Sequence, residues 1–169
     1  METAVIISIL EEKHIKAIIE GTKETNVSRY DEYLKMCVKE NDEMKRVTFG
    51  AFVENDFAGM VNVIFKSSYP YFNSNNIPEI NDLLVIPRFR NKGIAKKIID
   101  EAESYTAKSY KKIGLGVGLY KDYGAAQRLY FKNGYIPDGN GLMYNNVEVK
   151  PGIHAKVDDD LLIYLYKQI

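Results

Sequence analysis

The hydrophobic positions of the chain recur with two periods, and each period predicts one kind of element. Short apolar runs that alternate with polar residues, or that run without a break, are typical of strands. Strands are expected over residues 3–10, 45–53, 57–65, 79–86, 112–119, 141–144, 147–149 and 161–166. Asn145-Asn146 has the sequence of a two-residue hairpin turn. Residues 67–77 show no period and are expected to form a loop.

Apolar residues spaced three and four positions apart predict the helices. Helices are expected over residues 12–20, 28–38, 94–105 and 122–132. Ser28-x-x-Asp31 resembles a capping box, and Asp122 is expected to cap the last helix. Cys37 lies on the apolar stripe of the second helix, which favours a buried and inert thiol.

The stretch from Pro78 to Glu103 joins a strand, a basic turn and an amphipathic helix. Residues 83–86 are apolar without a break, as in a central strand, and Pro87 ends the strand because it cannot donate to a ladder. A helix start presents unpaired N–H groups, and Gly93 lets a ligand approach the backbone. The turn also carries three cations, Arg88, Arg90 and Lys92. The pattern predicts an anion-binding cradle.

The same turn carries a family resemblance. Arg90-Asn91-Lys92-Gly93-Ile94-Ala95 resembles the R/Q-x-x-G-x-G/A signature of the GNAT superfamily of acetyl-CoA-dependent N-acetyltransferases, and Leu84-Val85-Ile86-Pro87 is similar to its V-x-P strand end. The resemblance implies that the turn holds the pyrophosphate of coenzyme A and that the strand pairs with its pantetheine arm. The implied coenzyme-binding residues are Leu84, Val85, Ile86, Arg88, Arg90, Asn91, Lys92, Gly93, Ile94 and Ala95.

A second stretch, residues 122–135, resembles the family signature N-x-x-A-x-x-L-Y-x-x-x-G-F/Y. Its matching positions are Ala126, Leu129, Tyr130, Gly134 and Tyr135. Tyr123 stands where the family commonly has asparagine, and we count it among the coenzyme-binding residues. The two signatures imply a single N-acetyltransferase domain over residues 1–169. They also imply an α/β fold with a mixed, mostly antiparallel sheet flanked by helices, in which strands 79–86 and 112–119 splay to admit the pantetheine arm.

Two aromatic or glycine-rich stretches leave alternatives open. In the strand over 112–119, Gly114, Gly116 and Gly118 leave one face bare, so that either a ligand or a tightly packed helix can approach it. A dinucleotide fingerprint is excluded because Leu119 stands where its last glycine would be. The aromatic residues of the 67–77 loop either line an acceptor pocket or cover the sheet; they are Tyr69, Tyr71 and Phe72.

Acetyl transfer to an amine needs a base for the amine proton and an acid for the departing thiolate. The spacing from the Arg90 motif places Glu79 where the histone-acetylating members of the family carry their catalytic glutamate. The alternatives are Asp82, which a regular strand would turn to the opposite face, and a Glu79 that is only a solvated carboxylate. The family resemblance implies Tyr130 as the general acid; its alternative is a core tyrosine.

Composition narrows the class of protein. The 169 residues hold 23 Lys and Arg and 23 Asp and Glu, and this net charge of +0 argues against a nucleic-acid partner. No apolar run has the length of a membrane span, and glutamates near the start argue against a secretion signal. One cysteine excludes an internal disulfide and suits a reducing cytoplasm. His14 and His154 lack metal-ligand spacing, so no metal is expected.

We therefore expect an enzyme that moves the acetyl group of acetyl-CoA directly to a primary amine. The neutral charge favours a small-molecule acceptor, and a homodimer is one alternative for the oligomeric state. Acetylation of a protein N-terminus or lysine is the second hypothesis within the enzyme class. A non-catalytic sensor that binds acyl-CoA is the hypothesis from another class. Three successive aspartates, 158–160, either begin the last strand in solvent or hold a cationic acceptor.

Overall fold

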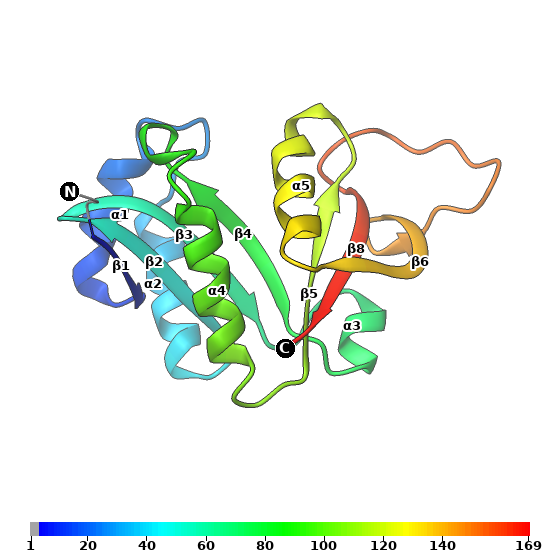
Figure 1. Cartoon of the computed structure of the whole chain (residues 1–169), viewed down its shortest axis with the longest axis horizontal. Coiled ribbons are helices and arrows are strands. Elements are labelled where there is room, and N and C mark those ends of the chain that lie inside the picture. The colour runs from blue at the N-terminus through cyan, green and yellow to red at the C-terminus, as the bar shows by residue number, and fades with distance from the viewer. Residues whose placement is uncertain (1–3) are drawn as a thin grey trace. The chain divides into compact units, whose positions relative to one another are not determined.

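The computed structural model describes residues 4–169, and the chain forms two compact units (Figure 1). The N-terminal unit combines the chain up to Phe65 with Ile80–Tyr105, and the C-terminal unit combines Lys66–Glu79 with Thr106–Ile169. A single domain over the whole chain stays a prediction, as does the splay between strands 79–86 and 112–119.

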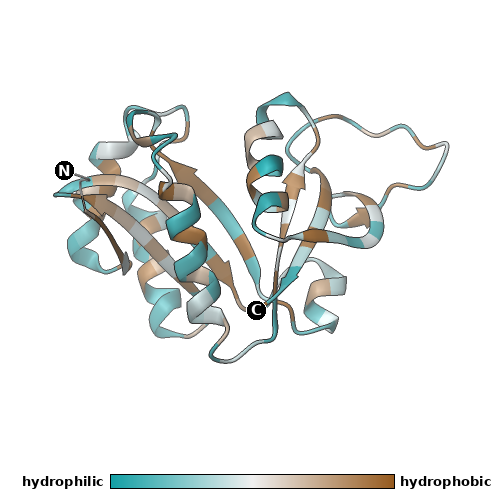
Figure 2. Ribbon diagram, in the orientation of Figure 1, coloured by the Kyte–Doolittle hydropathy of each residue, from teal (hydrophilic) through white to brown (hydrophobic). Residues whose placement is uncertain are grey.

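The N-terminal unit is built on strands hydrogen-bonded in the order β1-β2-β3-β4. Their bounds are Val5–Ile9, Arg46–Val53, Asp56–Ile64 and Glu79–Val85. The expected hairpin is confirmed, because β2 and β3 are antiparallel with Phe49 opposite Val61. Both strands are buried along almost their whole length. Figure 2 shows that these strands are mostly hydrophobic. The reason is that helices cover both faces of this sheet.

Helices α1 and α2 lie on one face of β1–β4, and α4 lies on the other (Figure 1). Helix α1 spans Ile15–Thr22 after the 3-10 turn η1 at Glu12–His14, α2 spans Asp31–Asp42, and α4 spans Ile94–Thr106. Cys37 is fully buried on α2, as its place on the apolar stripe predicts. On the other face, Ile98 and Ile99 of α4 are fully buried.

Both predicted helix caps are wrong. Helix α2 begins at Asp31 itself, and its N-cap Tyr30 makes no side-chain cap hydrogen bond. Helix α5 spans Gly124–Lys132 and has Tyr123 as its N-cap, while Asp122 lies in the 3-10 turn η3, Lys121–Tyr123. Capping motifs are defined by short patterns that also occur by chance in polar turns, so backbone geometry decides between them.

The C-terminal unit is built on strands hydrogen-bonded in the order β5-β8-β6-β7. Their bounds are Lys112–Gly118, Leu161–Gln168, Ile136–Tyr144 and Val147–Glu148. The β6–β7 turn is confirmed as a two-residue hairpin, with positive φ of 49° at Asn145 and 64° at Asn146. Part of the expected loop 67–77 is the short helix α3, Pro70–Ser74. The fold is thus mixed α/β with mostly antiparallel strands flanked by helices, as predicted.

The glycine face of β5 is filled by aromatic rings of the chain itself. A Cβ added at Gly114 would come within 2.4 Å of the Phe72 ring, and one at Gly118 within 2.4 Å of the Tyr123 ring. At Gly116 the nearest atoms belong to Leu162 and Tyr164. Phe72 is fully buried and stands in a core cluster with Tyr69 and Tyr164. The bare face therefore serves tight packing of α3, β8 and η3.

We expect Gly114→Ala to destabilise the protein by about 1–3 kcal/mol, because its methyl group must displace the Phe72 ring in a filled core. Gly124→Ala is the matched control: a Cβ there meets nothing within 4 Å, and the position has helical backbone geometry. It should leave the stability unchanged or raise it slightly. Urea unfolding measures both variants. Equal midpoints for Gly114→Ala and the wild type would contradict the packing account.

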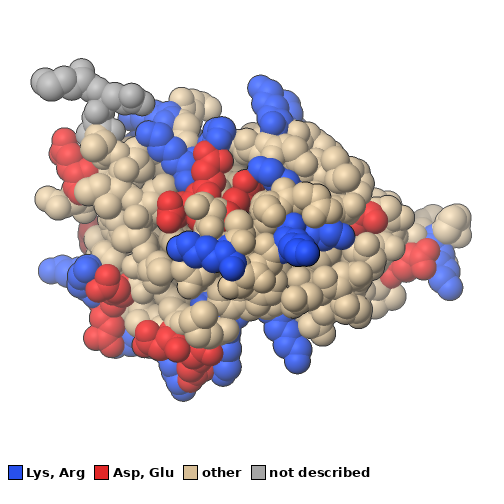
Figure 3. All heavy atoms as spheres, turned by 60° about the horizontal axis from the view of Figure 1, so that its bottom comes forward, with Lys and Arg blue, Asp and Glu red and all other residues tan. Residues whose placement is uncertain are grey.

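Charged side chains show no separation by sign on the surface in view. Figure 3 shows basic and acidic groups interspersed on that face, in keeping with the net charge of +0. Within residues 4–169, no helix is both long enough and apolar enough to cross a membrane.

Candidate active site

The predicted cradle is a turn with two left-handed residues at the start of α4. Strand β4 ends at Val85, the 3-10 turn η2 follows at Pro87–Phe89, and α4 begins at Ile94. Asn91 and Gly93 have φ of 59° and 74°. A Cβ at Gly93 would meet nothing within 4 Å, so this backbone is open to a ligand. Successive N–H groups in such a turn, together with the first turn of a helix, form a concave site for a phosphate. The residues present fit the pyrophosphate of coenzyme A.

The three cations of the turn have different surroundings. Arg88 forms ion pairs with Asp56 at 3.2 Å and Glu24 at 3.6 Å, so two carboxylates already balance its charge. The guanidinium of Arg88 lies 4.8 Å from the centroid of the Phe89 ring, and the ammonium of Lys92 lies 5.5 Å from the same centroid. Arg90 donates its Nε–H to the carbonyl of Val85 at 3.1 Å. This bond ties the turn to the end of β4 and leaves the terminal nitrogens of Arg90 for an anion.

The strand segment before the turn is held closely against β3. The N–H of Ile86 donates to the carbonyl of Ala58 at 2.9 Å. A Cβ at Gly59 would come within 2.6 Å of the Leu84 carbonyl oxygen, so only glycine permits this approach. The segment expected to pair with pantetheine, Leu84–Ile86, therefore has a fixed position in the N-terminal unit.

We expect Arg90→Ala to weaken coenzyme A binding by about 1–3 kcal/mol, because it removes a charged hydrogen-bond donor and a tie between the turn and β4. Calorimetric titration measures this change. Lys39→Ala removes an exposed cation of α2 and should leave the affinity unchanged. An Arg90→Ala affinity equal to that of the wild type would remove Arg90 from the cradle.

Glu79 is buried in the C-terminal unit, with 8% of its surface exposed. Its carboxylate accepts a hydrogen bond from the hydroxyl of Ser67, whose oxygen in turn accepts the N–H of Tyr69 at 2.9 Å. The structure therefore gives Glu79 a fixed side chain, unlike a solvated surface carboxylate. Its function as a base stays a prediction.

Two stacked tyrosines adjoin Glu79. The rings of Tyr69 and Tyr164 are 3.7 Å apart and nearly parallel. The hydroxyl of Tyr69 donates to Asp138 at 2.8 Å, and that of Tyr164 to the side-chain oxygen of Asn146 at 2.5 Å. Burial, and then the nearby charge of Glu79, raise the pKa of the Tyr164 phenol. Tyr69 and Phe72 are buried with Tyr164 and cover the sheet, whereas Tyr71 is only partly buried against this cluster. Asp138 and Glu79 bring negative charge to the same cluster.

Tyr130 lies on α5 with 7% of its surface exposed. Its ring meets that of Tyr135 edge to face at 5.8 Å between centroids. Burial raises the pKa of Tyr130 to about 12, because the phenolate would lose its hydration. The phenol is therefore protonated throughout the physiological range. It can donate a hydrogen bond at any working pH.

Tyr123 packs its ring on Gly118 and donates its hydroxyl to Asp159 at 2.9 Å. Burial, and then the hydrogen bond to Asp159, raise its pKa. Asp159 also accepts a hydrogen bond from Tyr120, and Asp158 accepts one from the hydroxyl of Tyr144 on β6 at 3.1 Å. These aspartates thus tie the segment before β8 to the chain. The contact of Tyr123 with coenzyme A stays a prediction.

Asp82 departs from the strand geometry that its sequence position implied. Its φ of 56° is left-handed, so the regular alternation of faces along β4 is broken at this residue. One carboxylate oxygen is paired with Arg29, and the other accepts the hydroxyl of Tyr33 at 2.9 Å. A carboxylate with both oxygens engaged in this way is poorly placed to take a proton from an amine. Nothing in the sequence signatures had pointed to Arg29 or Tyr33.

Comparisons with known proteins identify the family of the chain. The sequence profile of the acetyltransferase (GNAT) family matches residues 11–135. No curated protein sequence matches the chain. Within the part of the chain that the structure describes, no group of three or more His, Cys, Asp or Glu side chains comes together as a metal site.

Solved structures share the fold over nearly the whole chain. The spermidine/spermine N-acetyltransferase SpeG from Vibrio cholerae is 18% identical with a TM-score of 0.66, covering 99% of this chain and 94% of that one. RimL, a ribosomal L7/L12 alpha-N-protein acetyltransferase, is 14% identical with a TM-score of 0.71, covering 99% and 94%. The PaiA N-acetyltransferase from Thermoplasma acidophilum, solved with coenzyme A, is 16% identical with a TM-score of 0.64, covering 98% and 99%. At these identities the likeness concerns the fold alone.

Proposed function

The chain belongs to the acetyltransferase (GNAT) family, and from this premise we propose that it transfers the acetyl group of acetyl-CoA directly to a primary amine of a small molecule. The observation that carries the proposal is the open, left-handed turn at Asn91 and Gly93, which adjoins the fixed strand segment Leu84–Ile86. Acetyl-CoA supplies the acetyl group as a thioester. Residues 84–86 and the turn hold and orient the coenzyme through backbone groups, and Arg90 and Lys92 add positive charge. Arg88 and Tyr123 belong to the same proposed set.

Two residues of the C-terminal unit serve the proton transfers. As the amine nitrogen bonds to the acetyl carbon and the carbon–sulfur bond breaks, Glu79 takes up the amine proton, directly or through a water molecule. Tyr130 donates a hydrogen bond from its phenolic O–H to the departing sulfur, which leaves as a thiolate and takes its proton from water. Because the pKa of Tyr130, about 12, lies well above that of a thiol near 8.5, it acts chiefly as a hydrogen-bond donor that stays protonated. A backbone N–H near Val85 polarises the carbonyl.

Two carboxylates of the C-terminal unit, Glu79 and Asp138, favour a small cationic acceptor. Glu79 and Asp138 border the stacked pair Tyr69 and Tyr164, and carboxylates beside aromatic rings favour an ammonium group before it is deprotonated. SpeG, which shares the fold, is a spermidine/spermine N-acetyltransferase. RimL, which also shares it, acetylates a protein N-terminus, so a protein acceptor is the second candidate.

The test is a calorimetric titration with acetyl-CoA, followed by thiol detection with a panel of amines and peptides. We expect binding and release of one thiol per acetylated amine, with diamines and polyamines ahead of peptides. Turnover of peptides alone would move the proposal to a protein acceptor. Binding without thiol release on any acceptor would favour an acyl-CoA sensor. Failure to bind coenzyme A would overturn the proposal itself.

A further inference from the structure

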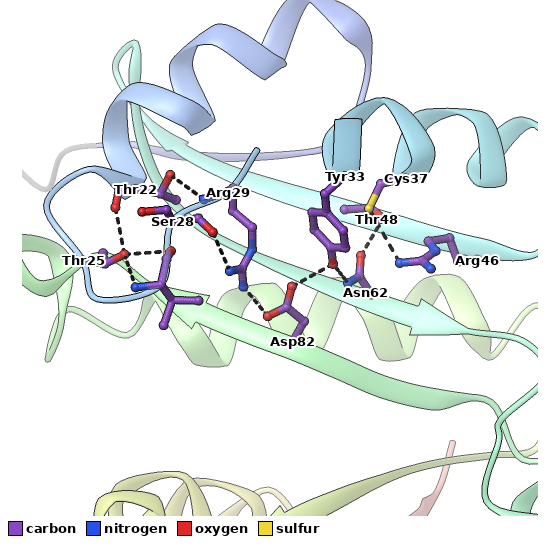
Figure 4. A network of polar contacts seen from close by, with 11 residues as sticks. Thr22, Thr25, Ser28, Arg29, Tyr33, Cys37, Arg46, Thr48, Asn62 and Asp82 are labelled. Atoms are coloured by element: carbon purple, nitrogen blue, oxygen red, sulfur yellow. Dashed lines mark hydrogen bonds and ion pairs between the residues drawn. The ribbon is translucent and has the colours of Figure 1, made fainter. Parts of the chain in front are cut away.

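A buried polar network crosses the N-terminal unit beneath α2 and ends on β4 (Figure 4). The hydroxyl of Thr48 on β2 donates to Asn62 on β3 at 2.7 Å, and the amide of Asn62 donates to the hydroxyl of Tyr33 at 3.0 Å. Tyr33 in turn donates to Asp82 on β4 at 2.9 Å. The network therefore connects three neighbouring strands to one helix.

Arg29 makes a further contact with Asp82. It pairs with the second carboxylate oxygen, and its guanidinium lies 5.7 Å from the centroid of the Tyr33 ring. Only 8% of the Arg29 side chain is exposed, against 26% for Asp82. The backbone N–H of Arg29 donates to the hydroxyl of Thr22 at 3.3 Å, which fixes the segment that carries it. Within residues 4–169, the buried Nε of Arg29 finds no hydrogen-bond partner.

Two features of these contacts lower the stability of the folded protein, so stability alone does not account for them. A buried arginine with an unpartnered nitrogen loses hydration that its ion pair restores only in part. Asp82 itself adopts a left-handed backbone in the interior of a strand, which side chains other than glycine rarely do. Strained backbone that persists under many restraints is typical of functional positions.

The position of Asp82 on β4 suggests what the strain serves. It lies between Glu79, the proposed base, and residues 84–86, the proposed partner of the coenzyme. The far end of that segment is fixed by the bond from Ile86 to Ala58 and by the close approach at Gly59. With that end fixed, the left-handed turn at Asp82 sets the direction in which the N–H and C=O groups of residues 83–85 point.

We propose that Arg29 and Tyr33 are positioning residues which act through Asp82. They hold the left-handed turn of β4 and so aim the backbone groups of residues 83–85 at the acetyl end of the coenzyme. This inference rests on the proposed function for its effect on turnover. Asp82 itself is an anchor and takes no proton from the amine.

The test compares Asp82→Gly with Asp82→Asn. Glycine accepts the left-handed backbone but cannot be anchored, whereas asparagine keeps the shape and loses the ion pair. We expect kcat to fall about tenfold in Asp82→Gly, because backbone donors that are loosely held stabilise the reacting carbonyl less well. The Kd of coenzyme A should change less than about threefold, since the turn at 90–95 is untouched. Asp82→Asn should lose less of kcat and keep the pH profile of the wild type.

Hydrogen exchange provides a readout that does not need activity. Amides of residues 83–86 should exchange about tenfold faster in Asp82→Gly and measurably faster in Tyr33→Phe, which keeps its ring and removes two hydrogen bonds, the one donated to Asp82 and the one accepted from Asn62. Asp100→Asn breaks an exposed pair with Lys96 on α4 and should leave this exchange unchanged. If the wild type turned over no acceptor, the proposed function would fail while the exchange result still decided the positioning.

Three results would overturn the inference. One is wild-type exchange and turnover in both Asp82→Gly and Tyr33→Phe. Another is loss of the acidic limb of the pH profile in Asp82→Asn, which would make Asp82 the base. The third is a fall in kcat with no change in exchange over residues 83–86, because the effect would then not pass through β4.

Discussion

Replacement of Glu79 by glutamine should lower kcat by about 10²–10³-fold at pH 7, because a positioned general base contributes on this order. The change keeps the shape of the side chain and its place beside Ser67 while removing the proton acceptor. A lysine-like amine has a pKa near 10, so almost all of it must lose a proton before it can attack at neutral pH. The deficit should therefore shrink as the pH approaches 10. Initial rates by thiol release, measured across this range, give the ratio directly.

An acceptor of lower basicity sharpens this test. A weakly basic amine is already neutral at pH 7, so Glu79→Gln should impair its acetylation much less than that of an alkyl amine. Glu148→Gln, at an exposed carboxylate of β7, is the matched control and should behave as the wild type. A deficit that is the same at every pH and for both amines would assign Glu79 a structural part instead of proton transfer.

Replacement of Tyr130 by phenylalanine should lower kcat by about 10²-fold while the affinity for coenzyme A stays nearly intact. The ring and its edge-to-face contact with Tyr135 remain, so the loss reports the phenolic hydrogen alone. Because burial raises the pKa of Tyr130 to about 12, its titration should leave no basic limb in the wild-type profile below about pH 10. Single-turnover rates and calorimetric titration separate the two quantities.

Tyr135→Phe is the matched control for this change, since it removes another buried phenolic group from the same neighbourhood. It should affect stability more than kcat. Equal turnover in Tyr130→Phe and the wild type would return Tyr130 to the role of a core residue. A parallel loss of coenzyme affinity would show that the hydroxyl acts in binding as well as in the chemical step.

The order and kind of the elements followed closely from the sequence, because they depend on local periodicity. The continuous apolar run before Pro87 predicted a strand, and β4 ends at Val85, but within that run only Leu84 and Ile86 are buried. The Asn145-Asn146 turn was predicted equally well, since both residues readily adopt positive φ. Local patterns failed where the outcome depended on distant contacts. The sequence contains capping patterns at Ser28 and Asp122, but neither residue is the N-cap of a helix in the structure.

The glycines of β5 illustrate a feature that depends on tertiary contacts. Their alternation predicted a bare face, but the sequence could not show whether a ligand or a side chain of the protein packs against it. The ring that fills the space at Gly114 comes from Phe72 on α3, far away in the sequence. Such a contact depends on how α3 returns to the sheet, and no periodicity records that path.

The sequence was sufficient for the family and for naming the candidates, which are the turn proposed to bind the coenzyme, Glu79 and Tyr130, because these rest on residues that lie close together along the chain. It could not supply the Arg29–Asp82–Tyr33 contacts or the left-handed backbone of Asp82. Those contacts join segments separated by about fifty residues. A residue takes up a strained conformation only where its surroundings hold it there. For Asp82, those surroundings exist only once the chain has folded.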